Sequence, residues 1–133
     1  MSNYHQLYYH AIWATKERHS WIDAELRQPL YSYLRGKIID MGGLTFAVGG
    51  IEDHVHVCLM IPPYIAVATF IGRLKGASAH WINHTQSPGT DFRWQEGYGV
   101  ITFRKEDLKR LVAYVEDQES HHHNGATEAG WEI

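Results

Sequence analysis

The order of strand-like and helix-like segments constrains the fold of this chain more than any other feature. Four segments have the aromatic and branched composition of β-strands, at residues 7–15, 44–51, 54–61 and 98–103. Apolar residues recur at helical spacing in two further segments, at about residues 23–41 and 64–84. The order strand, helix, strand, strand, helix, strand predicts an α+β fold of the ferredoxin-like (split βαβ) type, an antiparallel sheet with helices on one face.

The first helical segment has the clearest signals at both ends. Asp23 is a suitable N-cap, and Gly42-Gly43 end the segment. Its apolar stripe comprises Leu26, Leu30, Tyr33, Leu34 and Ile38. A last, C-terminal helix is expected from residue 104 or 105 to about residue 122.

Composition indicates one domain over residues 1–133. The chain has 133 residues and 44% hydrophobic content, enough for a single core. Residues 124–133 are expected to form a loose C-terminal tail. No apolar run is long enough to span a membrane, and the first residues do not resemble a signal peptide, so we expect a cytoplasmic protein. The single cysteine, Cys58, lies in an apolar run and is expected to be a packed small residue.

The charge balance limits how the chain can bind nucleic acid. A formal net charge of −3 excludes binding through overall basicity, because non-specific affinity comes mostly from neutralised phosphates. Contacts must then come from local basic clusters, although each cluster can also be a solvated face. These clusters contain Lys16 and Arg18, Arg73 and Lys75, and Arg104 and Lys105. Trp13, Trp21, Trp94 and Tyr98 are candidate stacking platforms for unpaired bases, although such aromatics more often belong to the core.

The segment His54-Val55-His56 predicts a two-imidazole clamp. In a strand, residues two apart point the same way, so both histidines share one face while Val55 and Val57 point into the helix-covered core. Imidazoles suit divalent ions of the first transition row, and such a site needs at least one further oxygen ligand. The alternative is two histidines that are simply hydrogen-bonded.

The C-terminal helix places polar residues on one stripe. Tyr114, Gln118, His121 and His122 stand at positions i, i+4, i+7 and i+8. An apolar flank contains Leu108, Leu111, Val112 and Val115. The polar stripe is unusual for packing alone, although a half-buried tyrosine beside solvated residues would also produce it. Tyrosine suits breakage and resealing of DNA strands, because a phosphotyrosine linkage conserves the bond energy for rejoining.

Several motifs occur in the order found in one protein family. They are Tyr9-His10-Ala11-Ile12-Trp13-Ala14-Thr15-Lys16, Asp53-His54-Val55-His56, Leu74-Lys75-Gly76, Trp94-Gln95-Glu96-Gly97-Tyr98 and Tyr114-Val115-Glu116-Asp117-Gln118. Over about residues 7–123 the chain resembles the single-tyrosine HUH transposases of the smallest bacterial insertion sequences. That group includes relatives that act on repetitive extragenic palindromes. Each motif is weak alone, whereas the ordered set is specific.

The resemblance implies a site and a reaction. His54 and His56 would bind a metal, Gln118 would supply a third ligand, and Tyr114 would be the nucleophile that takes a 5′-phosphate. The cofactor would be Mg²⁺ or Mn²⁺, and the substrate would be single-stranded DNA with hairpin ends. The protein would cleave and rejoin DNA at insertion-sequence or palindromic-repeat ends. It would act as a homodimer in which the tyrosine helix of one subunit can complete the partner's site.

Two other functions fit the same residues. One is a domesticated, non-cutting regulator that keeps the fold and binds DNA or RNA hairpins. The other is a metal hydrolase that uses His54, His56 and one of His121, His122 and His123. Loss of Tyr114 would leave the hydrolase active, so that residue separates the hydrolase from the transposase.

Overall fold

A four-stranded antiparallel sheet in the order β2-β3-β1-β4 lies at the centre of the protein. The structure is a computed structural model, and it describes residues 3–86 and 89–118. The strands are β1 (Tyr8–Ala14), β2 (Leu44–Ile51), β3 (His54–Met60) and β4 (Gly99–Thr102). The helices are α1 (Ala24–Asp40), α2 (Val67–Trp81) and α3 (Leu108–Glu116). The predicted α+β class and element order are therefore confirmed.

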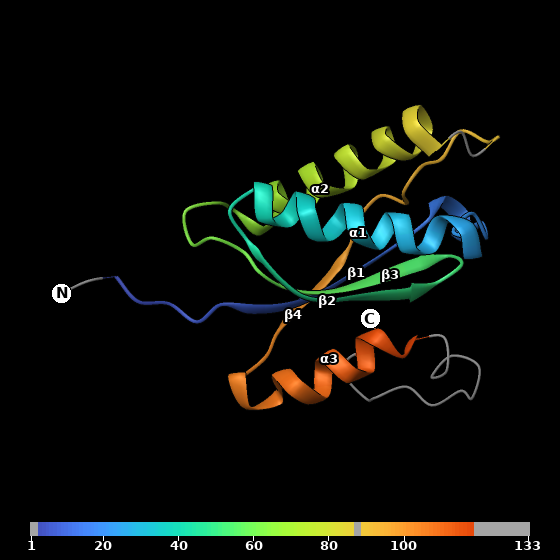
Figure 1. Cartoon of the computed structure of the whole chain (residues 1–133). Helices are drawn as coiled ribbons and strands as arrows, with labels where there is room; N and C mark the ends of the chain where they lie inside the picture. The colour runs from blue at the N-terminus through green and yellow to red at the C-terminus, as the bar shows by residue number, and fades with distance from the viewer. Residues whose placement is uncertain (1–2, 87–88, 119–133) are drawn as a thin grey trace.

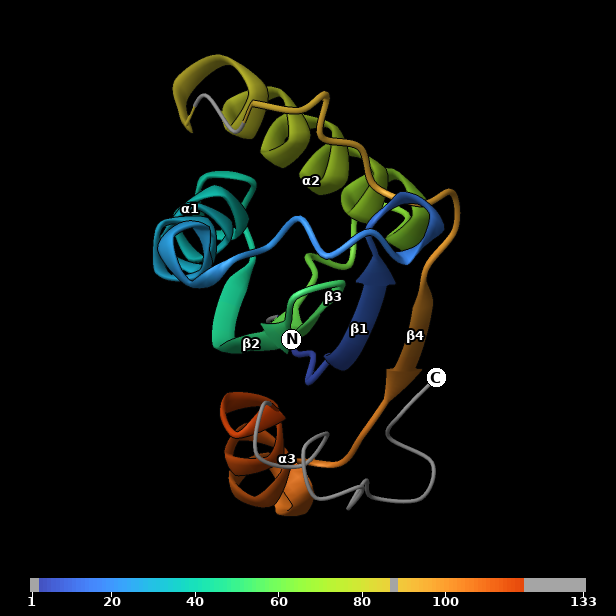
Figure 2. The same cartoon turned by 90° about the vertical axis from the view of Figure 1, so that its right-hand side faces the viewer.

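The three helices lie on two sides of the sheet. Helices α1 and α2 cover one face, and α3 lies against the other, as Figures 1 and 2 show. The main core fills the space under α1 and α2 and includes Ala11, Trp13, Val55, Val57 and Leu59 from the strands. A smaller cluster under α3 joins Ala47 and Cys58 to Leu111, Tyr114 and Val115. Because strand residues alternate between faces, β1 and β3 each contribute to both layers.

The first helix begins as the sequence predicts, with one correction to its apolar stripe. The Asp23 side chain accepts a hydrogen bond from the Leu26 backbone N–H at 2.8 Å, which caps the helix. Tyr31 is buried in the core, whereas Tyr33 is half-buried and stacks on Trp81 with ring centroids 4.7 Å apart. The stripe therefore turns toward Tyr31, because α1 packs against both the sheet and α2.

The second helix begins later than residue 64. Residues after Pro62-Pro63 form a turn in which the Ile65 N–H donates to the Pro62 carbonyl, at 3.3 Å. Ala66 is extended, with φ −66° and ψ 141°, so α2 starts at Val67. Beyond Trp81 the chain continues as a wider π turn, η2 (Ile82–Gln86). The turn from Pro62 to Ile65 and the extended Ala66 therefore delay the start of the helix.

The last helix begins later than predicted and has an irregularity near Asp117. A 3₁₀ turn, η3 (Lys105–Asp107), precedes α3, which ends at Glu116, and Asp117 leaves the helical region with φ −111° and ψ 30°. The regular helix is therefore interrupted at Asp117, whereas the expected continuation from residue 119 to residue 122 lies outside the described residues. His121 to His123 and the expected tail at residues 124–133 lie outside the described residues. Tyr114 is buried with Leu111 and Val115 instead of forming a separate polar flank.

In the described part of the chain, no helix has both the length and the apolar character needed to cross a membrane.

A close approach between β2 and α3 makes the fold sensitive to one glycine. A Cβ at Gly49 would collide with the backbone carbonyl of Val115. We expect Gly49→Ala to lower the free energy of unfolding by about 1–3 kcal/mol, the usual cost of overpacking, measured by urea denaturation. Gly36→Ala is the matched control, because Gly36 lies in α1 with nothing within 4 Å of its added Cβ. Equal midpoints for the two variants would contradict the close approach.

Candidate active site

The two predicted histidines of β3 lie side by side on the face that α3 covers. His54 and His56 are 1% and 0% exposed, and their ring centroids are 5.1 Å apart. Val55 and Val57 point into the main core on the opposite face, as the alternation predicts. The site therefore stands on a central strand whose backbone is held by neighbours on both edges.

A third buried histidine, which the sequence pattern did not single out, joins them from β1. His10 Nε2 lies 2.8 Å from His56 Nδ1, within hydrogen-bond distance, and the two rings stack at 22° with centroids 5.1 Å apart. Ala11 and Trp13 face the main core, so alternation puts His10 on the α3 side. The alternation in β1 can be seen in the sequence, but it places His10 beside His56 only once β1 is known to pair with β3.

Asp53 and Arg18 hold His54 from the exposed end of the site. His54 Nδ1 lies 2.7 Å from Asp53 Oδ1, whereas Arg18 Nη1 is 3.2 Å from the same nitrogen and 3.5 Å from the carboxylate oxygen. One ring nitrogen cannot both donate to Asp53 and accept from Arg18. The contact with the Asp53 carboxylate is the shorter, so we place the proton on Nδ1. Nδ1–H therefore donates to Asp53, and Nε2 of His54 is the atom able to bind a metal.

The backbone that carries Arg18 has an uncommon conformation. Glu17 and Arg18, in the short turn η1 (Lys16–Arg18), have φ values of 54° and 57°. Left-handed backbone at residues other than glycine costs about 1 kcal/mol or more each, and such residues cluster at functional sites. The Glu17 N–H donates to Gln95 Oε1 at 2.9 Å, which helps to hold the turn. The guanidinium therefore reaches Asp53 from a constrained loop.

Helix α3 brings Tyr114 to the histidines. The Tyr114 side chain is 2% exposed, and its ring centroid lies 6.0 Å from that of His56 and 6.4 Å from that of His10, edge-on to both. Gln118 follows one turn later and is 1% exposed. Its Nε2 donates to the Tyr114 carbonyl at 3.2 Å, whereas Oε1 is buried without a hydrogen-bond partner among the described residues.

A shallow groove opens beside His54. It has a volume of about 160 Å³ and is lined by Arg18, Trp13, Tyr98 and residues 95–99. The Lys75 amine donates to the carbonyls of Gln95 and Gly97, both at 2.7 Å, and so fixes this wall of the groove. Burial lowers the pKa of Lys75, and nearby Glu96 opposes that effect. In this structure Lys75 holds the loop of residues 95–97, and its contact with DNA stays a prediction.

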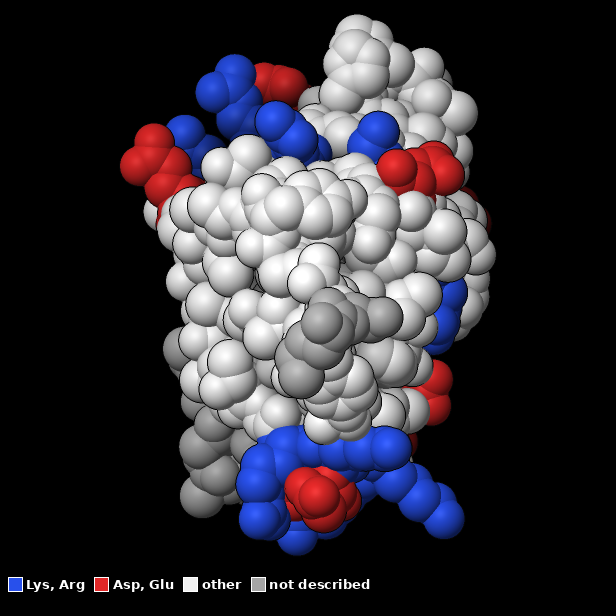
Figure 3. Space-filling model, turned by 90° about the vertical axis from the view of Figure 1, so that its left-hand side faces the viewer, with Lys and Arg blue, Asp and Glu red and all other residues white. Residues whose placement is uncertain are grey.

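The other predicted basic residues lie farther from the histidines. Arg73 is exposed on α2, across the sheet from Tyr114. Lys16 is exposed in η1, and Arg104 and Lys105 are exposed before α3, at the end opposite Gln118. Lys and Arg side chains gather around that end of α3, mixed with Asp and Glu (Figure 3). Arg18 contacts a site histidine, with its Nη1 at 3.2 Å from His54 Nδ1.

The predicted stacking aromatics divide between core and groove. Trp13 is buried at 2% exposure and Trp94 packs edge-on against it, with centroids 5.9 Å apart. Trp21 packs on the main core and stacks on His19. Tyr98 is 38% exposed in the groove wall, so it is the best placed of the four to meet an unpaired base.

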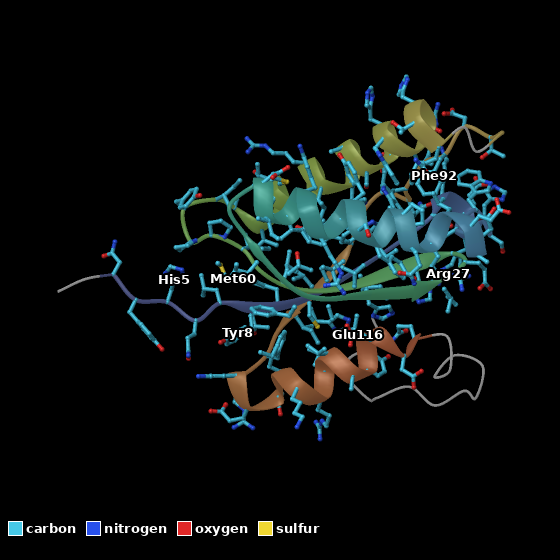
Figure 4. The ribbon with its side chains drawn as sticks, in the orientation of Figure 1. His5, Tyr8, Arg27, Met60, Phe92 and Glu116 are labelled. Carbon is cyan, nitrogen blue, oxygen red and sulfur yellow. The ribbon has the colours of Figure 1, made fainter. Side chains whose placement is uncertain are left out.

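Helix α3 ends at Glu116 beside the sheet. Tyr8 and Met60 lie toward the opposite end of the sheet (Figure 4). The Glu116 carboxylate is 3.7 Å from Arg35 Nη2, an ion pair that joins α3 to α1. Both side chains are about half exposed, so the pair adds little to stability. Packing at Gly49 and under Tyr114 therefore positions the helix.

The fold is similar to that of solved transposase structures. A crystal structure of a putative transposase from Deinococcus radiodurans R1 matches with a TM-score of 0.68 and 29% identity, covering 89% of this chain and 95% of that one. A REP-associated tyrosine transposase bound to a REP hairpin matches with a TM-score of 0.65 and covers 98% of this chain and 76% of that one. At 17% identity, that second match shows the shared fold alone.

Sequence comparison gives the family. The model of the family described as "Transposase IS200 like" matches residues 3–118. The ISDra2 transposase TnpA of Deinococcus radiodurans is 30% identical over 120 residues, 86% of this chain and 85% of that protein. The transposase of insertion sequence IS200 from Salmonella typhimurium is 31% identical over 117 residues, 83% of this chain and 75% of that protein. The chain belongs to the IS200-like transposase family, which confirms the resemblance seen in its motifs.

The buried thiol beside the site gives a direct test of the packing under α3. Burial, with a smaller contribution from Glu116, raises the pKa of Cys58 to about 12. A raised thiol pKa leaves almost no thiolate at neutral pH, so we expect the native protein to resist iodoacetamide and the guanidinium-unfolded chain to react readily. Mass spectrometry measures this without ambiguity, because the chain has one cysteine. Equal labelling of native and unfolded protein would show that α3 does not cover Cys58.

Proposed function

We propose that this transposase cleaves and rejoins single-stranded DNA at insertion-sequence or palindromic-repeat ends, with Tyr114 as the nucleophile. The observation that carries the proposal is the 6.0 Å separation of the Tyr114 and His56 rings within one chain. A strand-transfer tyrosine has to work beside the groups that activate the phosphodiester, and this pair meets that requirement. The reaction would take place in the cytoplasm.

The chemistry follows from the phenol group. A tyrosine hydroxyl has a pKa of about 10 and attacks poorly until its proton is removed or shielded. In the proposed step the Tyr114 oxygen forms a bond to phosphorus while the bond to the 3′ oxygen breaks, and the 3′ oxygen takes up a proton. The product is a 5′-phosphotyrosine linkage and a free 3′ hydroxyl. The reverse attack by a 3′ hydroxyl rejoins a strand without an outside energy source.

The proposed cofactor is Mg²⁺ or Mn²⁺, and the imidazoles in the donor set suit Mn²⁺, an ion of the first transition row, better than Mg²⁺. Asp53 orients His54 with Nε2 as the ligand atom, and Gln118 Oε1 is a buried amide oxygen without a partner among the described residues. His54, His56 and Gln118 would therefore hold the ion, with two nitrogen ligands and one oxygen ligand. When bound, it would polarise the scissile phosphate and stabilise charge on the leaving oxygen.

The DNA contacts would be local, because the chain carries a net charge of −3. Arg18 stands beside His54 at the mouth of the groove, where a guanidinium suits a phosphate, and Tyr98 offers a face to a base. Exposed Lys16, Arg73, Arg104 and Lys105 would contact the more distant parts of a hairpin end. The proposed form is a homodimer in which the tyrosine helix of one subunit can complete the partner's site, and Tyr114 lies beside His56 of its own chain in this structure.

Removal of one oxygen tests the nucleophile. We expect Tyr114→Phe to form no covalent adduct with single-stranded element ends in the presence of Mn²⁺, because the attacking atom is gone. A denaturing gel measures the adduct. Tyr33→Phe is the matched control, since Tyr33 stacks on Trp81 across the sheet from the site. Cleavage without an adduct in Tyr114→Phe would favour the hydrolase function, and hairpin binding without cleavage by the wild type would favour the non-cutting regulator.

The metal role is tested separately. We expect His56→Ala to lose cleavage, while its affinity for a hairpin stays within a few-fold of wild type, because the basic contacts are untouched. Gel shift measures binding, and product formation over a Mn²⁺ series measures cleavage. His80→Ala on α2 is the control, because His80 is exposed and its ring contacts that of His84, away from the site. Wild-type cleavage by His56→Ala would remove His56 from the metal site.

A further inference from the structure

We propose that His10 is a positioning residue for His56: it accepts the Nδ1–H of His56 and so presents Nε2 of His56 to the metal. The inference rests on the proposed metal site and assigns a role to a residue outside the predicted ligand set. It concerns the orientation and the tautomer of a ligand. His10 itself does not touch the reacting atoms in this role.

The contact between the two histidines is short and buried. His10 Nε2 and His56 Nδ1 are 2.8 Å apart, and both residues are 0% exposed. The residues stand on paired strands, where His10 lies opposite Cys58 and His56 opposite Ile12. Stacking at 22° keeps the rings nearly parallel. The pair is therefore fixed by the sheet and does not depend on a flexible loop.

A hydrogen bond between two neutral imidazoles has two possible directions. If His10 donates from Nε2, then His56 carries its own proton on Nε2, which blocks that atom as a ligand. If His56 donates from Nδ1, then its Nε2 has a lone pair available for a metal. Only the second direction allows His56 to act as predicted. His10 must then carry its proton on Nδ1 and accept at Nε2.

Comparison with His54 explains why the acceptor for His56 is an imidazole. The Nδ1–H of His54 donates to the Asp53 carboxylate, which is 20% exposed and has Arg18 within 3.5 Å. A carboxylate at the position of His10 would be fully buried, and an unpaired buried charge is costly. A neutral imidazole supplies the acceptor without that cost. The partly exposed Asp53 thus orients His54, and the buried, neutral His10 orients His56.

Three variants separate orientation from packing. His10→Leu removes the acceptor while keeping apolar bulk, and His10→Gln keeps an acceptor oxygen at the end of the side chain. Cys58→Ala is the matched control, because Cys58 is buried on the same face opposite His10 and is not a predicted ligand. Mn²⁺ binding without DNA is measured by electron paramagnetic resonance. The ¹⁵N shifts of the His56 ring in the metal-free wild type report which nitrogen carries the proton.

We expect His10→Leu to weaken Mn²⁺ binding by about 10–100-fold, the usual effect of losing such a partner. His10→Gln should recover most of that loss, and Cys58→Ala should bind as wild type does. The ¹⁵N spectrum of the wild type should show the proton on Nδ1 of His56. That last measurement needs no variant, so it decides the question even if His10→Leu does not fold.

The contrary outcomes are distinct. Wild-type Mn²⁺ affinity in His10→Leu alongside a loss in His56→Ala would overturn the role of His10 and leave the metal site intact. A His56 proton on Nε2 would also overturn the role of His10, and the Mn²⁺ affinity of His56→Ala would then show separately whether His56 is a ligand. Equal weakening in His10→Leu, His10→Gln and Cys58→Ala would show that His10 acts only through packing. Equal Mn²⁺ binding by wild type and His56→Ala would remove the metal site itself, and the role of His10 with it.

Discussion

The approach of the α3 backbone to Gly49 is the constraint on which the site depends. Strand β3 is central in the sheet, and its two faces serve different layers, with Val55 in the main core and His56 under α3. Without a helix on the second face, the histidines would be a solvated pair on an open sheet. Because a residue without a side chain stands at the contact, the helix comes close enough for Tyr114 to meet the imidazoles.

The site combines two ways of orienting a histidine. At its exposed end, His54 is held by a carboxylate with an arginine beside it, and that arginine comes from a turn with left-handed backbone. At its buried end, His56 meets the His10 imidazole. The loop wall held by Lys75 lies next to the exposed end. Rigid strands therefore fix the deeper half, whereas loops fix the half that faces the groove.

Local sequence pattern predicts the strands, the first helix and the two histidines of β3. It does not predict contacts that depend on which segments pair in the fold. Strand alternation placed His54 and His56 on one face, and the capping signal at Asp23 located the start of α1. His10 was missed because its significance depends on strand pairing across 46 residues, which periodicity does not encode. The contacts of Lys75 also depend on the fold, since sequence does not show that its amine donates to the carbonyls of Gln95 and Gly97. The irregularity at Asp117 is also invisible to the pattern, because the helical spacing of Tyr114 and Gln118 continues across it.

The small size of the cluster under α3 has a consequence for motion. Five residues of α1 and four of α2 are buried, against three of α3. Because α3 contributes Leu111, Tyr114 and Val115 to that cluster, any motion that lifts α3 from the sheet also opens the cluster and separates Tyr114 from the histidines. Tyr114 thus meets the histidines only while α3 stays docked on the sheet, so that contact depends on a separate small layer and not on the main core.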